Sequence, residues 1–189
     1  MEFVEPIRDK KKIEAMKLML RGSNLRNYCL FVLGINSGLR VSDLLRLNIE
    51  DVLNERGKVL DRITIREKKT GKAKTFPISS SARKSIEEYL EKRSPYLRSD
   101  PLFVSRKGNC PIQRVQAWKA LNKAAKAVRI KERIGTHTLR KTFAYHAYKQ
   151  GQDITLIQKL LNHSAPSVTL RYIGITQDQM DDVYLTLNL

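Results

Sequence analysis

Apolar residues recur every three to four positions along most of the chain, and this spacing predicts a mostly helical protein. An early helix follows Asp9, which is expected to cap its start, and a more apolar helix begins at Leu25 and stops near Gly38. Ser42 is expected to cap a short third helix. Further helices are predicted over residues 81–92, 113–128, 138–149, 154–161 and 176–187.

One segment changes to the alternation of apolar and polar residues that is typical of β-strands. Ile63 and Ile65 alternate with polar residues, a turn follows at residues 69–72, and residues 75–78 resume an extended pattern. This predicts a β-hairpin, or a small three-stranded sheet if residues 59–60 join the first strand.

The expected fold class is therefore mostly α with a small antiparallel β-sheet (α+β). A loop-rich stretch, residues 94–111, could join two parts, but each side alone is too small for a stable core. We expect a single domain over residues 1–189. A hydrophobic content of 41% is enough for a buried core and argues against disorder.

Composition narrows the function classes. The chain has 36 Lys and Arg against 19 Asp and Glu, a net charge of +17, which favours a polyanionic partner such as nucleic acid. Ribosomal and membrane-surface proteins share such a surplus. No apolar run could span a bilayer, and the start is no signal peptide, so we expect a cytoplasmic protein associated with the nucleoid and no membrane partner. Cys29 and Cys110 indicate neither a disulfide framework nor a zinc site.

The charge is uneven along the chain. Residues 173–189 contain three Asp and no Lys or Arg, so the rest of the chain carries 36 basic against 16 acidic side chains, a charge of +20. The apolar residues of the predicted last helix lie on one stripe. This tail is expected to be a docking segment for protein rather than for DNA, with packing against the chain's own core as the alternative.

Several polar motifs could bind or transform a phosphate. Arg40 precedes a predicted helix start, where backbone N–H groups also favour anions, and Asp43 is close enough to orient it. His137 and Arg140 lie three apart and so on one helix face. Each motif alone is more often an ordinary surface feature.

Two late residues complete a series. His163 follows a predicted helix, and Tyr172 comes nine residues later. A tyrosine at such a position more often packs at the edge of the hydrophobic core than takes part in catalysis. His146 is interpreted as structural. Taken together with a hairpin lysine, the series suits metal-free transesterification at a DNA phosphate. Tyrosine supplies the nucleophile, arginines bind non-bridging oxygens, a lysine protonates the departing 5′-oxygen and a histidine accepts the tyrosine proton.

The segments SGLRVSDLLRL, KKTGK, HTLRKTFAYH and LLNHSAPSVTLRY, in this order, resemble the catalytic domain of tyrosine recombinases, the phage integrase family. The resemblance runs from about Asp9 to the C-terminus. It implies a site-specific DNA recombinase that cleaves and rejoins strands through a 3′-phosphotyrosyl intermediate, without metal or ATP. The catalytic residues that it implies are Arg40, Lys69, His137, Arg140, His163 and the nucleophile Tyr172, with Asp43 in support.

Within the hairpin, Lys68 and Lys72 compete with Lys69 for the general-acid position. The residues expected to contact DNA phosphates are Lys68, Lys72, Lys74, Arg106, Lys107 and Lys141. The chain departs from the family pattern at Asn162, where many members have glycine, and at Asp43, where many have glutamate. Neither departure removes a catalytic group.

The resemblance also implies partners. Double-stranded DNA is the substrate, and the family assembles as a homotetramer on synapsed DNA and is monomeric or weakly associated without it, with accessory DNA-bending proteins in some systems. The helix expected at residues 176–187 would then dock on a neighbouring protomer. The catalytic pattern starts almost at Met1, so the sequence is either a fragment of a longer protein or, as we expect, a chain with no separate N-terminal core-binding domain, as in short bacterial members such as fimbrial phase-variation recombinases.

Three other readings remain open from the residues. A type IB topoisomerase would use similar chemistry without site preference. A catalytically silent DNA-binding or regulatory protein would bind DNA and form no adduct, although all six catalytic positions are filled. A basic ribosomal or RNA-binding protein would explain the charge and leave the catalytic series unexplained.

Overall fold

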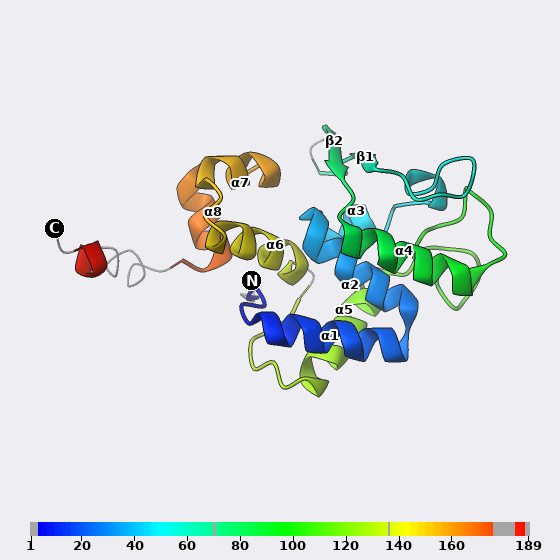
Figure 1. The fold of residues 1–189 in the computed structure, drawn as a ribbon, viewed down its shortest axis with the longest axis horizontal. Helices are drawn as coiled ribbons and strands as arrows, with labels where there is room; N and C mark the ends of the chain where they lie inside the picture. The colour runs from blue at the N-terminus through cyan, green and yellow to red at the C-terminus, as the bar shows by residue number, and fades with distance from the viewer. Residues whose placement is uncertain (1–3, 70, 136, 176–183, 188–189) are drawn as a thin grey trace.

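The computed structural model describes residues 4–69, 71–135, 137–175 and 184–187. Figure 1 shows two groups of helices joined through α6, with the hairpin on the larger group. The elements in chain order are α1 (Lys10–Ser23), α2 (Leu25–Ser37), α3 (Val41–Leu44), the 3-10 turn η1 (Ile49–Asp51), β1 (Arg62–Arg66), β2 (Ala73–Pro77), α4 (Ser80–Arg93), α5 (Arg114–Ala127), α6 (Thr138–Lys149), α7 (Ile154–Leu161) and α8 (Pro166–Ile173).

The predicted fold class is confirmed, and most helices lie where the periodicity places them. Asp9 caps α1 by accepting a hydrogen bond from the Lys11 amide at 2.7 Å. Gly38 ends α2 in the left-handed conformation, at φ 62°. A Cβ atom on Gly38 would lie 2.6 Å from the Phe143 ring, so glycine also permits the close approach of α2 and α6.

Three expectations are corrected or fall outside the described residues. Helix α3 is capped at Arg40 instead of Ser42, because the chain already turns helical at Val41. The sheet has two strands, since Val59 pairs with Leu53 in an isolated bridge away from β1. The helix predicted over residues 176–187 falls mostly outside the described residues, of which 184–187 are helical and exposed.

Helix α8 was missing from the sequence-based prediction. It begins with Pro166 in its first turn and ends at Gly174, which has a positive φ of 76°. Both are ordinary boundary signals. The helix has only eight residues, so its apolar repeat is too short to stand out.

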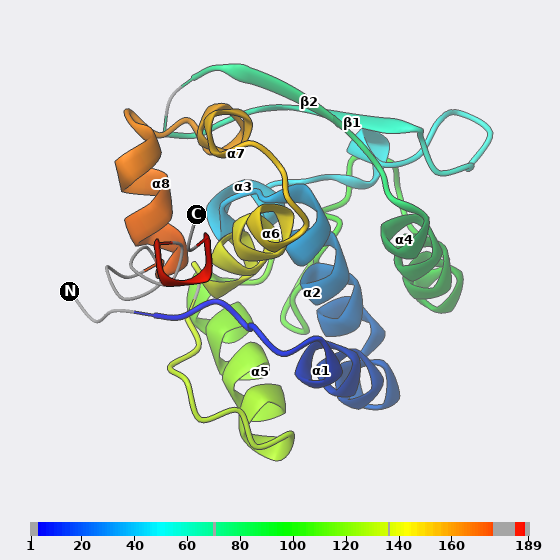
Figure 2. The ribbon, with the colours of Figure 1, turned by 60° about the vertical axis from the view of Figure 1, so that its left-hand side comes forward.

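The hairpin turns one face toward the helices. Ile63 pairs with Phe76, and both side chains are buried, whereas Thr64 and Thr75 on the other face are exposed and share a hydrogen bond of 2.9 Å. Ile65 pairs with Lys74, which therefore lies on the same face as Phe76. Figure 2 shows the hairpin extending across the molecule above α3 and α7.

The buried residues form two clusters. The larger one joins α1 to α5 with the hairpin and includes Leu139 at the start of α6. The smaller one joins α6, α7 and α8 through Ala144, Tyr145, Ile157, Leu161 and Ile173. Because α6 contributes to both clusters, its first turn lies where they meet. Among the described residues, no helix is long and apolar enough to cross a bilayer.

Candidate active site

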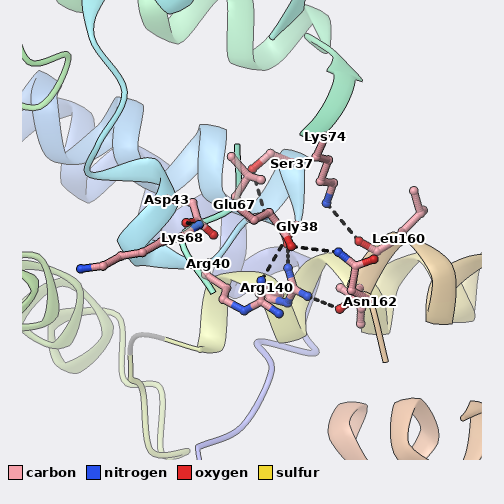
Figure 3. Close-up of polar contacts among 12 residues, drawn as sticks. Ser37, Gly38, Arg40, Asp43, Glu67, Lys68, Lys74, Arg140, Leu160 and Asn162 are labelled. Carbon is pink, nitrogen blue, oxygen red and sulfur yellow. Dashed lines mark hydrogen bonds and ion pairs between the residues drawn. The ribbon is translucent and has the colours of Figure 1, made fainter. Parts of the chain in front are cut away.

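Arg40 and Arg140 lie next to each other where α2, α6 and α7 approach (Figure 3). Arg140 is only 2% exposed. One guanidinium nitrogen, Nη1, donates to the Gly38 carbonyl at 2.6 Å, and Nη2 donates to the Leu161 carbonyl. Arg140 thus joins the C-terminal ends of α2 and α7, and its position is fixed by the backbone of both.

The carboxylate beside Arg40 is Glu67, at the hairpin end of β1. Glu67 Oε1 lies 3.2 Å from Arg40 Nη1, and the Glu67 side chain has no exposed surface. Asp43, expected to orient Arg40, is buried and instead accepts a hydrogen bond of 3.0 Å from the Lys68 amide. Glu67 is not among the residues predicted for the site, and its one signal in the sequence is an acidic residue within a strongly basic hairpin.

The predicted nucleophile lies beside both predicted histidines. The Tyr172 hydroxyl is 3.4 Å from His137 Nδ1. The His163 ring meets the Tyr172 ring edge-on, with centroids 4.8 Å apart, and His163 Nδ1 shares a hydrogen bond of 3.1 Å with the Thr169 hydroxyl. Helix α8 carries both Thr169 and Tyr172, so it orients the histidine and the tyrosine together.

The surroundings change the proton affinity of these groups. Burial, followed by the charges of Arg140 and Arg40, lowers the pKa of His163 to about 4. Burial, with Arg114 and Arg140, also lowers the pKa of His137. Burial raises the pKa of Tyr172, and the two site arginines oppose that rise. At neutral pH both imidazoles are therefore neutral and able to accept a proton, while the phenol stays protonated until a base removes its proton.

The lysine that reaches the buried site is Lys74, on β2. Its Nζ donates to the Leu160 carbonyl at the end of α7, 3.0 Å away, and Figure 3 shows it pointing toward α7. Burial, followed by the charge of Arg140, lowers its pKa to about 8. Lys69 lies exposed in the hairpin turn, and the Lys68 ammonium extends away from the arginines. Lys69 thus remains a prediction for the general acid, with Lys74 as a second candidate.

The predicted phosphate contacts divide into exposed and buried residues. Lys72 is exposed, and Arg106 and Lys107 lie on an exposed loop beside a groove of about 540 Å³ against α1 and α5. Lys141 is only 4% exposed, with its Nζ 5.0 Å from the centre of the Tyr172 ring. The half-buried Lys74 and the buried Lys141 therefore lie at the site itself, and their contact with DNA phosphates stays a prediction.

His146 has the structural role predicted for it, since its Nε2 hydrogen-bonds with the Ile7 carbonyl at 2.9 Å. Among the described residues, no three His, Cys, Asp or Glu side chains are arranged to hold a metal ion. What converges is a phenol, two neutral imidazoles and two guanidinium groups, which together can bind an anion and activate an oxygen nucleophile.

Comparison with known proteins places this site in a family. A sequence profile of the phage integrase family matches residues 9–179. The chain is 44% identical over 184 residues to the probable integrase/recombinase YoeC of Bacillus subtilis, covering 97% of each chain. It is 35% identical over 164 residues to the tyrosine recombinase XerD of Corynebacterium glutamicum, covering 85% of this chain and 52% of XerD.

A solved structure shares the fold. The XerH site-specific recombinase, bound to its palindromic difH substrate in a post-cleavage complex, superposes with a TM-score of 0.76 at 19% identity, covering 96% of this chain and 52% of XerH. The chain thus spans nearly the whole of YoeC but about half the length of XerD and XerH. From the matched residues, the shared fold and the convergence of the predicted site residues, the chain belongs to the phage integrase family of tyrosine recombinases.

Proposed function

We propose that this chain is a site-specific DNA recombinase that cleaves and rejoins strands through a covalent phosphotyrosyl intermediate. The observation that carries the proposal is the placement of the Tyr172 hydroxyl beside His137, at a site where Arg40 and Arg140 lie together. The XerH structure that shares this fold holds a DNA substrate after cleavage, which supports DNA as the substrate here.

The first step transfers a phosphate from DNA to the protein. His137, neutral at physiological pH, accepts the Tyr172 proton as the phenolic oxygen attacks the scissile phosphorus. The bond from phosphorus to the 5′-oxygen breaks, and that oxygen leaves as a 5′-hydroxyl after taking a proton from a lysine. The 3′-phosphate remains bound to Tyr172.

The two arginines serve the same step. Charge builds up on the non-bridging oxygens of the pentacoordinate transition state, and two guanidinium groups fixed beforehand bind it without reorganising. Arg140 is fixed by two backbone carbonyls. The His163 imidazole is held by Thr169 and contacts the ring of Tyr172, which supports a role for it in bonding a phosphate oxygen.

The second step reverses the first. A 5′-hydroxyl from another strand attacks the phosphotyrosyl phosphorus, and Tyr172 leaves and regains its proton. The energy of the original bond is kept in the phosphotyrosyl ester, so we propose that neither ATP nor a metal ion takes part.

We further propose that the chain acts as a catalytic domain on duplex DNA in the cytoplasm, at the nucleoid, within a tetramer that forms on synapsed sites. The net charge of +17 supports binding to duplex phosphates, which weakens steeply with salt. Contacts of this kind position a protein without reading sequence. Accessory DNA-bending proteins and a tail that docks between protomers belong to the same proposal.

The test of this function is adduct formation. A nicked duplex from the flanks of the gene, whose cleavage releases a short 5′-hydroxyl fragment, should trap the protein on DNA in a form that survives detergent. Relaxation of an unrelated supercoiled plasmid at a similar rate would favour a type IB topoisomerase. DNA binding with no adduct on any flank sequence would favour a silent binding protein.

The lysine that protonates the leaving oxygen can be identified by changing the leaving group. A substrate with sulfur at the 5′ bridging position leaves as a thiolate and needs little protonation, so loss of the general acid should matter only with oxygen. We expect Lys69→Ala to slow adduct formation on the oxygen substrate by about 10²–10⁴-fold and to approach the wild-type rate with sulfur. Lys74→Ala is the matched comparison.

The pH dependence of cleavage gives a separate test of Lys74. The pKa of Lys74 is about 8, so if Lys74 were the donor the cleavage rate would fall as the pH rises through 8, and Lys74→Arg would remove that fall. If sulfur rescues Lys74→Ala and not Lys69→Ala, the assignment of Lys69 is wrong and Lys74 replaces it.

A further inference from the structure

We propose that Glu67 is a positioning residue for DNA cleavage, which links the hairpin to Arg40 on one side and to the His163 turn on the other. This inference rests on the proposed recombinase function. Glu67 itself is too deeply buried to meet DNA, with a side chain that has no exposed surface.

The two carboxylate oxygens of Glu67 contact two different parts of the site. Oε1 lies 3.2 Å from Arg40 Nη1, and Oε2 accepts a hydrogen bond of 2.8 Å from Asn162 Nδ2. Arg40 and Asn162 are far apart in the sequence and lie on either side of the carboxylate, as Figure 3 shows. One side chain therefore fixes the distance between the first arginine and the end of α7.

The backbone of Glu67 belongs to the hairpin turn. Its N–H donates to the Lys72 carbonyl at 3.0 Å, and its carbonyl accepts from the Gly71 N–H at 2.9 Å. The residue is therefore held in the hairpin by its main chain, while its carboxylate reaches out to the site. A movement of the turn, which carries the lysines expected to contact DNA, is transmitted to Arg40 and Asn162.

Asn162 passes this constraint to a catalytic group. It ends α7 in the left-handed conformation, at φ 50°, and directly precedes His163. Glycine would adopt this backbone as readily, so the conformation alone does not require an amide. The asparagine adds a side chain whose amide donates a hydrogen bond to the Glu67 carboxylate on the hairpin, and this contact fixes the turn at which His163 lies.

The charge of Glu67 has a second effect, on the arginine pair. Two guanidinium groups side by side repel each other, and the buried carboxylate next to Arg40 offsets that repulsion before a phosphate arrives. The site is then assembled in advance, with both cations in place. Loss of the charge should let Arg40 shift, while the surface that grips DNA stays intact.

The experiment exchanges the amide and the carboxylate. The variants are Glu67→Gln, Asn162→Asp and the double variant that carries both, with Asp61→Asn as a matched control. Asp61, just before β1, forms an exposed ion pair with Arg83 at 2.8 Å, so that variant removes a carboxylate from an ion pair away from the site. For each protein we measure the rate of adduct formation on saturating nicked duplex, the affinity for intact duplex and the thermal midpoint.

We expect Glu67→Gln and Asn162→Asp each to slow adduct formation by about 10- to 100-fold, the range typical of residues that orient catalytic groups. DNA affinity should fall by less than about threefold in Glu67→Gln. The double variant restores one amide and one carboxylate across the contact, so its rate loss should be at least about tenfold smaller than the product of the two single losses. A merely structural residue would lower the thermal midpoint without this rescue of rate.

Two results would overturn the proposal. One is single variants that cleave at the rate of Asp61→Asn. The other is a double variant whose shift in thermal midpoint equals the sum of the two single shifts and whose loss of rate equals the product of the two single losses. The contact would then not couple the two residues. Comparing the thermal midpoints of the wild type, the two single variants and the double variant needs no DNA, so it tests the contact even if the wild-type protein forms no adduct. The absence of an adduct with the wild type would instead refute the proposed function.

Discussion

Replacing Tyr172 by phenylalanine is expected to abolish the covalent adduct with nicked DNA while DNA binding remains. The variant removes a single oxygen, the proposed nucleophile, which lies 3.4 Å from His137 Nδ1. The aromatic ring keeps its edge-on contact with His163, so the site stays assembled. Because the phenylalanine ring has no oxygen that could attack phosphorus, the loss should be complete within the detection limit of a labelled-DNA gel.

The matched control is Tyr96→Phe, at a half-buried tyrosine after α4 that packs against the larger hydrophobic cluster. It should form the adduct at the wild-type rate. Intact-duplex affinity should agree within about twofold between wild type and Tyr172→Phe, since that hydroxyl is one neutral group among many phosphate contacts. An undiminished adduct with Tyr172→Phe would remove Tyr172 from the mechanism.

Replacing Arg140 by alanine is expected to slow adduct formation by about 10²–10³-fold or more, because a fixed donor to the transition state is lost. The same change should lower stability. The carbonyls of Gly38 and Leu161 would lose their buried donor, at about 1–3 kcal/mol for each group left unpaired. Arg140→Lys keeps the charge but cannot present two N–H groups in a fork, so it should recover only part of the rate.

A variant of a second buried arginine, Arg93, is the control that distinguishes a loss of cleavage rate from a loss of stability. Arg93 is largely buried and donates from Nη1 to the carbonyls of Pro101 and Leu102, at 2.6 and 3.0 Å, away from the site. Arg93→Ala should lower the thermal midpoint as Arg140→Ala does and leave the cleavage rate per folded molecule unchanged. Equal rate losses in the two variants, measured well below both midpoints, would show that Arg140 acts only through folding.

The sequence predicts most helices because their apolar faces repeat over two or more turns, as from Leu25 to Gly38. The sequence also offers candidate site residues, of which Arg40, Arg140, His137, His163 and Tyr172 lie together in the structure, while their catalytic roles are implied by the family resemblance and stay predictions. The apolar periodicity does not predict helix α8 because its eight residues give too short a repeat, although Pro166 and Gly174 mark both of its ends.

The partners of the catalytic residues are harder to predict, because they depend on tertiary contacts. Nothing in the spacing indicates that Glu67, instead of Asp43, lies beside Arg40. One tertiary feature, the inward orientation of Lys74, could have been predicted from the strand pattern. Lys74 and Phe76 are two apart on β2, so the strand that buries Phe76 also turns Lys74 inward.

The central claim, that Tyr172 carries the DNA phosphate, is tested most directly by locating the bond. The trapped adduct is digested with nuclease and protease, and the peptide that retains a nucleotide is identified by mass spectrometry. The account predicts a single nucleotide-bearing peptide containing Tyr172, with the nucleotide attached through a 3′-phosphate to the tyrosine oxygen. A nucleotide on any other residue, or one attached through a 5′-phosphate, would contradict it.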